Sequence, residues 1–154
     1  MVFTFGNVTV DIDVEMTRSY YAKEPTVRHT CRCNGCQNYD DVILTAPESV
    51  LSFFKQLGLD PQKPTEVFGL WLTPENGQYL YGGWIHVVGR LLTNGNSVQP
   101  ETAYRPSPEY ECLVWFTDDK SKFGPVKKDF PTPILELPFQ IRLPWLLNET
   151  EKRL

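Results

Sequence analysis

The stretch of sequence that decides the fold, residues 67–92, reads VFGLWLTPENGQYLYGGWIHVVGRLL. It contains two runs dense in Val, Ile, Leu, Trp and Tyr, at residues 67–73 and 78–92, separated by PENG at 74–77. Because Asn-Gly readily adopts the positive φ angles of a tight turn, these residues predict a β-hairpin. The Gly82-Gly83 pair predicts a bulge or a close backbone approach, since both positions lack a side chain.

Further strands are expected on both sides of this hairpin. Residues 8–14 alternate apolar and polar side chains, which is typical of a half-buried antiparallel strand. Phe3 and Phe5 predict a strand before it, and residues 16–22 are expected to continue the meander. Turns or loops are expected at residues 94–96 and 98–108.

Two strands are expected near the C-terminus. Residues 112–117 are apolar at both alternating positions, which predicts a central strand buried on both faces. Residues 135–143 alternate cleanly, and Pro138 predicts that this strand lies at an edge or is bulged, because proline donates no ladder hydrogen bond.

Two helices are expected between these strands. Residues 37–44 contain no Pro or Gly and predict a short helix. Thr45 and Glu48 form a capping-box pattern before a second helix, which Gly58 would end in the left-handed conformation. The sequence therefore predicts an α+β fold, a mainly antiparallel sheet with a two-helix insertion, in a single domain over residues 1–154.

The composition narrows the functional classes. The chain has 154 residues, 41% of them hydrophobic, and a net charge of −4, so it can build one core but is poorly suited to neutralising phosphates. We expect no nucleic-acid or membrane partner. Asp11 and Asp13 interrupt the N-terminal apolar residues, so no secretory signal is visible and a cytoplasmic location is expected. The composition does not specify an oligomeric state.

A cysteine cluster at residues 29–36, HTCRCNGC, is the most chemically distinctive feature. Cys31, Cys33, Cys36 and His29 offer the thiolate and imidazole ligands that tetrahedral zinc prefers. All four lie in one short segment, whereas structural zinc sites usually draw ligands from two, so Cys112 or His86 could be a distant ligand. We therefore expect no bound cofactor, and zinc is the candidate cofactor if one is bound.

Two other interpretations of the cluster remain open. Cys33 and Cys36 form a CxxC motif before a helix, whose N-terminus lowers thiol pKa values in redox proteins, although no βαβ unit accompanies it here. Alternatively, the cysteines pack as small buried side chains under the start of the helix.

Aromatic side chains suggest a protein-binding role. Trp71, Tyr79, Tyr81 and Trp84 lie together on the hairpin, and Tyr and Trp are common anchors of protein interfaces. His86, in the same run, is expected to be a core histidine bonded to backbone. The chain lacks GxSxG, HExxH, GxxxxGK[ST] and GxGxxG motifs, which favours a non-enzymatic function.

Several motifs together resemble a family of small bacterial proteins, mostly from Gram-positive lineages, that has no established activity. They are CxCxxCxN followed by Tyr39, LGLDP at residues 57–61, YGG at 81–83 with His86 and Gly89, and LPW at 143–145. The resemblance covers most of the chain and implies that the cysteine motif and the hairpin belong to one unit. We therefore expect a cytoplasmic protein-binding module with a structural cysteine cluster; zinc binding and thiol redox chemistry at Cys33 and Cys36 are the alternatives.

Overall fold

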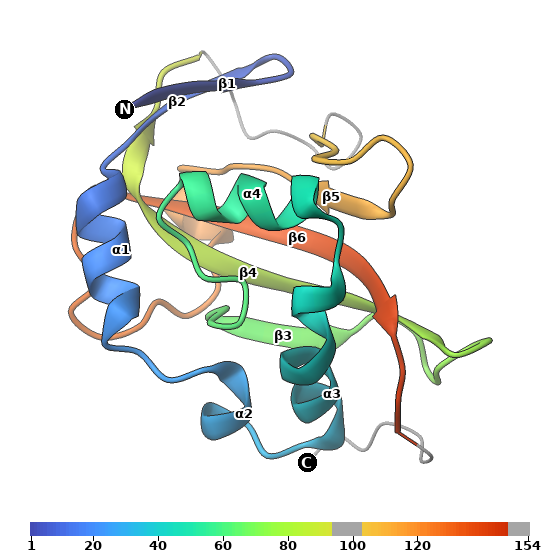
Figure 1. Cartoon of the computed structure of the whole chain (residues 1–154). Helices are drawn as coiled ribbons and strands as arrows, with labels where there is room; N and C mark the ends of the chain where they lie inside the picture. The colour runs from blue at the N-terminus through green and yellow to red at the C-terminus, as the bar shows by residue number, and fades with distance from the viewer. Residues whose placement is uncertain (94–102, 148–154) are drawn as a thin grey trace.

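The sheet is built on two long antiparallel strands, β4 (Gln78–Leu91) and β6 (Ile134–Pro144) (Figure 1). The structure is a computed structural model that describes residues 1–93 and 103–147. All pairings are antiparallel, in the order β1-β2-β4-β6-β5, with β3 also pairing with β4. The remaining strands are β1 (Val2–Phe5), β2 (Val8–Ile12), β3 (Glu66–Gly69) and β5 (Cys112–Val114). The expectations at residues 94–96, and those of 98–108 that precede residue 103, lie outside the described residues.

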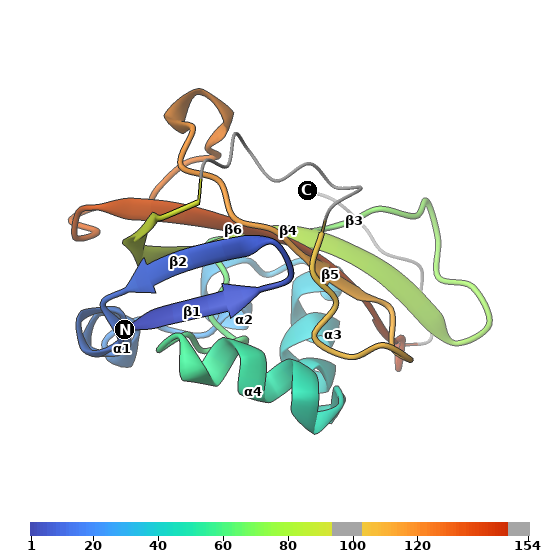
Figure 2. The ribbon, with the colours of Figure 1, turned by 90° about the horizontal axis from the view of Figure 1, so that it is seen from above.

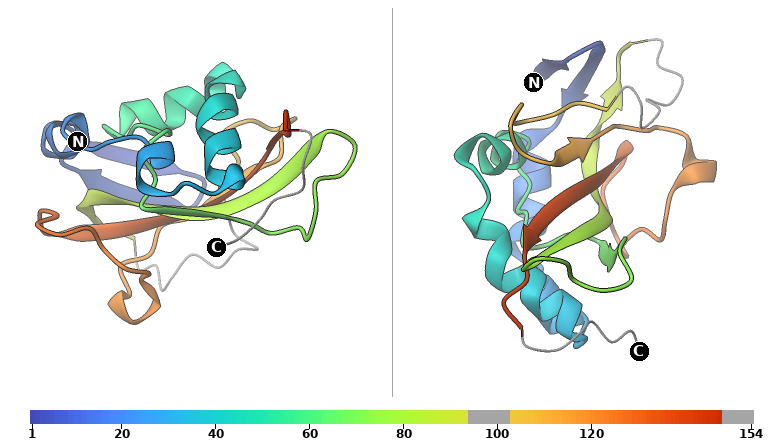
Figure 3. Two further views of the ribbon diagram at one scale, coloured as in Figure 1. Left: turned by 90° about the horizontal axis from the view of Figure 1, so that it is seen from below. Right: turned by 90° about the vertical axis from the view of Figure 1, so that its right-hand side faces the viewer.

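Helices cover one face of this sheet, and a loop covers part of the other (Figures 2 and 3). The helices are α1 (Val14–Ala22), α2 (Val27–Thr30), α3 (Asn34–Val42), the 3₁₀ helix η1 (Ile43–Thr45) and α4 (Glu48–Gln56). On the opposite face, the loop after β5 contains the 3₁₀ helix η3 (Lys120–Lys122). The predicted α+β class with an antiparallel sheet is confirmed.

The predicted hairpin is confirmed, but its first strand ends at Gly69 rather than at residue 73. Asn76 and Gly77 have φ angles of 52° and 71°, as the Asn-Gly turn requires. The pair Gly82-Gly83 forms no bulge, because the pairing of β4 with β6 continues through both residues. It is a close approach instead: a Cβ atom on Gly83 would lie 2.4 Å from the carbonyl oxygen of Glu66 in β3.

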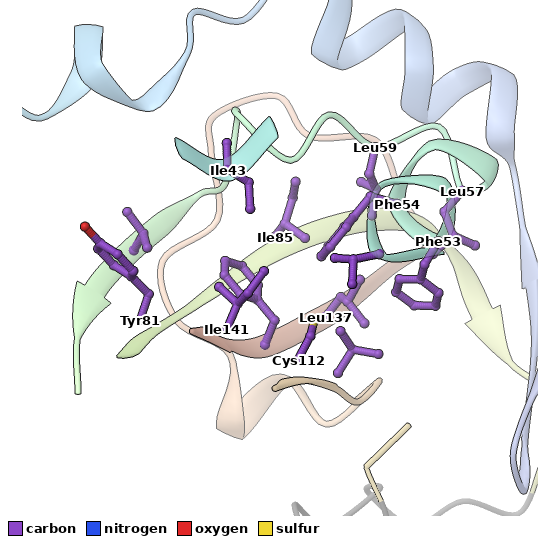
Figure 4. Close-up of a cluster of buried hydrophobic side chains, with 14 of the residues drawn as sticks. Ile43, Phe53, Phe54, Leu57, Leu59, Tyr81, Ile85, Cys112, Leu137 and Ile141 are labelled. Atoms are coloured by element: carbon purple, nitrogen blue, oxygen red, sulfur yellow. The ribbon is translucent and has the colours of Figure 1, made fainter. Parts of the chain in front are cut away.

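The core lies between the sheet and helices α3 and α4 (Figure 4). Phe54 of α4 packs edge-on against Phe139 of β6, with ring centroids 6.1 Å apart. Tyr39 of α3 contacts Tyr81 of β4 in the same way at 5.4 Å. Gly58 ends α4 with a φ of +82°, which confirms the predicted left-handed cap.

Residues 16–22 belong to α1 rather than to a further strand, so this expectation was wrong. The apolar alternation of β2 ends because Asp13 caps the helix, its Oδ1 accepting the N–H of Met16 at 3.0 Å. Side chains of α1 then hydrogen-bond to backbone groups of β4, along the part of its edge between β3 and β2. The Tyr21 hydroxyl donates to the carbonyl of His86 at 2.7 Å, and Thr17 Oγ1 accepts the N–H of Val88 at 3.1 Å.

The first predicted helix is displaced and the predicted capping box is absent. The helix expected at residues 37–44 begins earlier, at Asn34, and continues into η1. Thr45 lies in η1, two positions before the N-cap residue of α4, and donates its hydroxyl to the carbonyl of Val42 at 2.6 Å. Pro47 is the N-cap residue and makes no side-chain capping bond.

The expected positions of the two C-terminal strands were also wrong. Cys112 lies in β5, at the end of the strand order, whereas β6 lies between β4 and β5. Pro138 is tolerated there because its partner Trp84 turns its carbonyl toward β3, where it accepts the N–H of Thr65 at 2.9 Å. The missing proline N–H therefore costs no hydrogen bond to β4.

Candidate metal centre

The three clustered cysteines are positioned by the junction between α2 and α3, which lie next to each other beside the sheet (Figure 3). Cys31 is the C-cap residue of α2, and Cys33 is the N-cap residue of α3, both with extended backbone. Cys36 lies in the first turn of α3. Two helix ends therefore bring together residues that the chain separates by at most five positions.

The sulfur atoms form a compact group. The Sγ atoms of Cys31, Cys33 and Cys36 all lie within 4.8 Å of one another, and those of Cys31 and Cys33 are 3.2 Å apart. Cys33 Sγ also accepts the backbone N–H of Cys36 at 3.3 Å. Cys36 is buried, whereas Cys31 and Cys33 are half-buried, so an ion from solvent can reach two of the three sulfurs.

The thiols have different proton affinities. Burial opposes the loss of a proton from Cys31, but hydrogen bonds from the Cys36 thiol and from the backbone and thiol of Cys33 outweigh it and lower its pKa. Burial, followed by the neighbouring thiols, raises the pKa of Cys36. Burial also raises the pKa of Cys33. The cluster therefore favours one thiolate, on Cys31, stabilised by its two neighbours.

Asp40 of α3 fastens the segment that carries Cys31. Its Oδ2 accepts the hydroxyl of Thr26 at 2.6 Å and the backbone N–H of Arg28 at 3.3 Å, at the beginning of α2. Its Oδ1 accepts the side-chain amide of Gln62 at 2.9 Å. Because the carboxylate is buried and each oxygen has a donor, Asp40 fixes α2 against α3.

Two expected ligands are not part of the group. Within residues 1–93 and 103–147, no His, Asp or Glu and no fourth cysteine joins the three sulfurs. His29 is exposed on α2. Cys112 is 0% exposed in the core beneath α4 (Figure 4), where burial raises its pKa to about 12. The second-segment ligand expected of a zinc site is therefore supplied by neither Cys112 nor His86, which lies on β4.

The expectation that the hairpin aromatics form a partner-binding surface was wrong for two of them. Tyr79 and Tyr81 are fully buried, because their positions in β4 face the helices. The Tyr81 hydroxyl instead donates to the carbonyl of Gly35 at 2.8 Å, beside Cys36, so it positions the first turn of α3. Trp71 and Trp84 are half-buried and remain accessible.

His86 is buried as expected, but its ring bonds to side chains rather than backbone. Nδ1 lies 3.1 Å from Oγ1 of Thr65, and Nε2 lies 3.1 Å from Oε1 of Glu136. The sequence did not reveal that Glu136 and Asp40 bond to buried groups. The local pattern places Glu136 on a solvent-facing side of a strand, and it places Asp40 in an ordinary turn of a helix. Only the register of β4 with β6 brings Glu136 opposite His86.

Comparison of the chain with protein family models, with curated proteins and with solved structures yields no match. The resemblance to a bacterial family therefore stays a prediction. In the described part of the chain, no helix has both the length and the apolar content of a membrane span. The cluster can hold a metal ion, and its geometry is the basis for a functional proposal.

Proposed function

We propose that the protein binds a zinc ion through Cys31, Cys33 and Cys36. The observation that carries the proposal is the approach of the three Sγ atoms to within 4.8 Å of one another. Thiolates are ligands that Zn²⁺ strongly prefers, and the group is half-accessible to solvent.

The spacing of the sulfurs is close to that of a zinc thiolate site. With Zn–S bonds of about 2.3 Å, tetrahedral geometry places neighbouring sulfurs about 3.8 Å apart. Cys31 and Cys33 are 3.2 Å apart, so zinc requires their sulfurs to separate by a few tenths of an ångström. Cys31 follows the end of α2, so a rotation of its side chain achieves this while Cys33 Sγ keeps its bond to the first turn of α3.

Three sulfurs leave a fourth position on the metal. Structural zinc sites usually have four protein ligands, whereas sites that keep a position for water or another ligand have three. No fourth ligand joins the group among the described residues. The proposed ion would therefore accept water, a small molecule or a side chain of a partner protein at its fourth position.

The pKa values of the three cysteines suggest how zinc would bind to the reduced, metal-free protein. Cys31 has a lowered pKa and is suited to make the first bond to the ion. Cys33 and Cys36 have raised pKa values and must release their protons as the ion binds. Zinc binding should therefore release protons and strengthen as the pH rises.

Zinc titration against a chromophoric chelator tests the proposal. The reduced protein should bind one equivalent, and Cys31→Ser, Cys33→Ser or Cys36→Ser should each weaken binding strongly. Cys112→Ala is the matched control, because it removes a thiol outside the cluster. Binding that survives all three serine substitutions, or that depends on Cys112, would exclude this site.

The 3.2 Å approach of Cys31 to Cys33 supports a second candidate function, thiol redox chemistry. Its sulfur pair differs from the Cys33–Cys36 pair expected from the CxxC motif, because the lowered pKa belongs to Cys31. Thiol counting before and after mild oxidation distinguishes the two functions. A redox site loses two thiols with the first molar equivalent of diamide, a two-electron oxidant that takes up both electrons and both protons as the disulfide forms, and zinc would protect them.

A further inference from the structure

The sheet face opposite α3 and α4 carries a cleft that the proposed metal site does not use. Its volume is about 500 Å³, within the size range of small-molecule sites. Its walls and floor include Phe68 of β3, Trp84 of β4, Trp115 after β5, and Glu136 and Gln140 of β6. Lys122, Phe123 and Gly124 line one side of it, and they belong to the loop carrying η3, which lies on the sheet face opposite the helices (Figure 2).

Glu136 is the chemically distinctive residue of this cleft. Its side chain is only 3% exposed, yet it lines the cleft. Oε1 accepts the backbone N–H of Gly124 at 2.9 Å and lies 3.1 Å from Nε2 of His86. Among the described residues, no hydrogen bond reaches Oε2, and this oxygen is not sealed from solvent. It is therefore an acceptor open to the cleft.

The aromatic walls are held in place before any ligand arrives. The indole of Trp84 packs on Gly124 so closely that a Cβ atom there would lie 2.3 Å from the ring, and its Nε1–H points to the carbonyl of Pro125 at 3.4 Å. On the other side, the ring of Phe68 lies over Gly82, 3.0 Å from the position of a Cβ atom. Rigid walls reduce the conformational entropy that the cleft itself must lose when a ligand binds.

We propose that this cleft binds a small organic cation, a protonated amine or amidine attached to a flat apolar body. The apolar body would lie between Trp84, Trp115 and Phe68, and the cationic N–H groups would donate to Oε2 of Glu136. Aromatic faces attract cations, and a buried carboxylate with one free oxygen is stabilised by a charged donor. An anionic ligand is disfavoured, because its charge would be repelled by the Glu136 carboxylate in a site of low polarity.

Benzamidine and its neutral counterpart benzamide test this proposal, because they share a shape and differ in charge. Binding is followed by the chemical shifts of the Gly124 amide and the Trp84 indole N–H. Benzamidine should bind at least about tenfold more tightly, the equivalent of one charge-assisted hydrogen bond. Equal affinities, shifts confined to residues outside the cleft, or no binding of benzamidine would overturn the proposal.

Glu136→Gln supplies a second test that keeps the shape of the side chain. The variant should bind both compounds with similar affinity, because its amide no longer carries the charge. Lys122→Gln, which removes a cation at the mouth of the cleft, should strengthen benzamidine binding and leave benzamide unchanged. A folded Glu136→Gln protein that still prefers benzamidine would contradict the assignment of Glu136. The wild-type comparison stands by itself should the variant fail to fold.

Discussion

Replacing Asp40 with asparagine should loosen the frame that brings the cysteines together. The change preserves the shape of the side chain but removes its charge and one of its two acceptors. Whichever way the amide turns, its NH₂ group must face a donor, either Gln62 or the pair formed by Thr26 and Arg28. Hydrogen bonds to charged groups contribute about 1.5–3 kcal/mol each, so we expect a loss of about 3 kcal/mol of unfolding free energy.

The neighbouring Asp41 provides a matched control. Asp40 and Asp41 both pair with Arg28, but their side chains are 3% and 48% exposed. Exposed ion pairs contribute about 0.2–1 kcal/mol, so Asp41→Asn should change stability by less than about 1 kcal/mol. For a domain of this size, the difference corresponds to a melting temperature about 5–10 °C lower for Asp40→Asn.

The same pair of variants tests the link to the metal site. Because Asp40 holds the start of α2, its loss should displace Cys31 and weaken zinc binding by about 10–100-fold, as is usual for residues that orient ligands. Asp41→Asn should bind zinc like the wild type. Urea unfolding and chelator competition give the two quantities, and equal behaviour of the variants in either assay would refute this view of Asp40.

Three further predictions concern the sheet and the thiols. Gly83→Ala should cost about 3 kcal/mol in urea unfolding, because its methyl group meets a β3 carbonyl oxygen at 2.4 Å, whereas the methyl group of Gly82→Ala lies 3.0–3.2 Å from the side chains of Phe68 and Leu70, which need to shift only slightly, and should cost about 1 kcal/mol or less; similar losses would contradict the register. Tyr21→Phe leaves two backbone groups of β4 without their partner and should cost about 1–3 kcal/mol by the same measurement, and an unchanged midpoint would disprove its role at this edge. Cys31 has a lowered pKa, whereas burial raises the pKa of Cys112 to about 12. As the pH rises, Cys31 should therefore be alkylated before Cys112, which mass spectrometry of the modified protein measures. Modification of Cys112 first would contradict this order of thiol pKa values.

The hairpin could be predicted because its signals are local. Asn76 and Gly77 adopt the positive φ angles that their sequence suggests, and Gly58 ends α4 in the same way. The start of α1 could not be predicted with equal success. Val14 continues the apolar alternation of β2, so the pattern of a strand overlaps the start of a helix that Asp13 caps. A single capping bond decides between them.

The cysteine site was predictable in its members but not in its surroundings. Cys31, Cys33 and Cys36 are close in sequence, so any turn between two helices brings them together. The residues that position them lie farther along the chain, as with Tyr81, which bonds to Gly35 across 46 positions. Such contacts follow from strand register and helix packing, which no local pattern encodes.

Strand order was the least predictable feature. The segment containing Cys112 is apolar on both faces, which is typical of a central strand, yet it pairs only with β6 among the described strands. Cys112 and Val114 point into the hydrophobic core, and a bridge between Val114 and Tyr104 covers the outer edge of the strand. An edge strand covered by its own loop has the same composition as a central one.

Sulfur coordination of the bound metal is the most direct test of the central claim, that Cys31, Cys33 and Cys36 form a three-thiolate site with one further position. X-ray absorption at the zinc edge should show three sulfurs at about 2.3 Å and one oxygen or nitrogen in the protein loaded with one equivalent of zinc. Cys36→Ser should reduce the sulfur count to two or abolish binding. A first shell without sulfur, or one with four sulfurs in the wild type, would contradict the account.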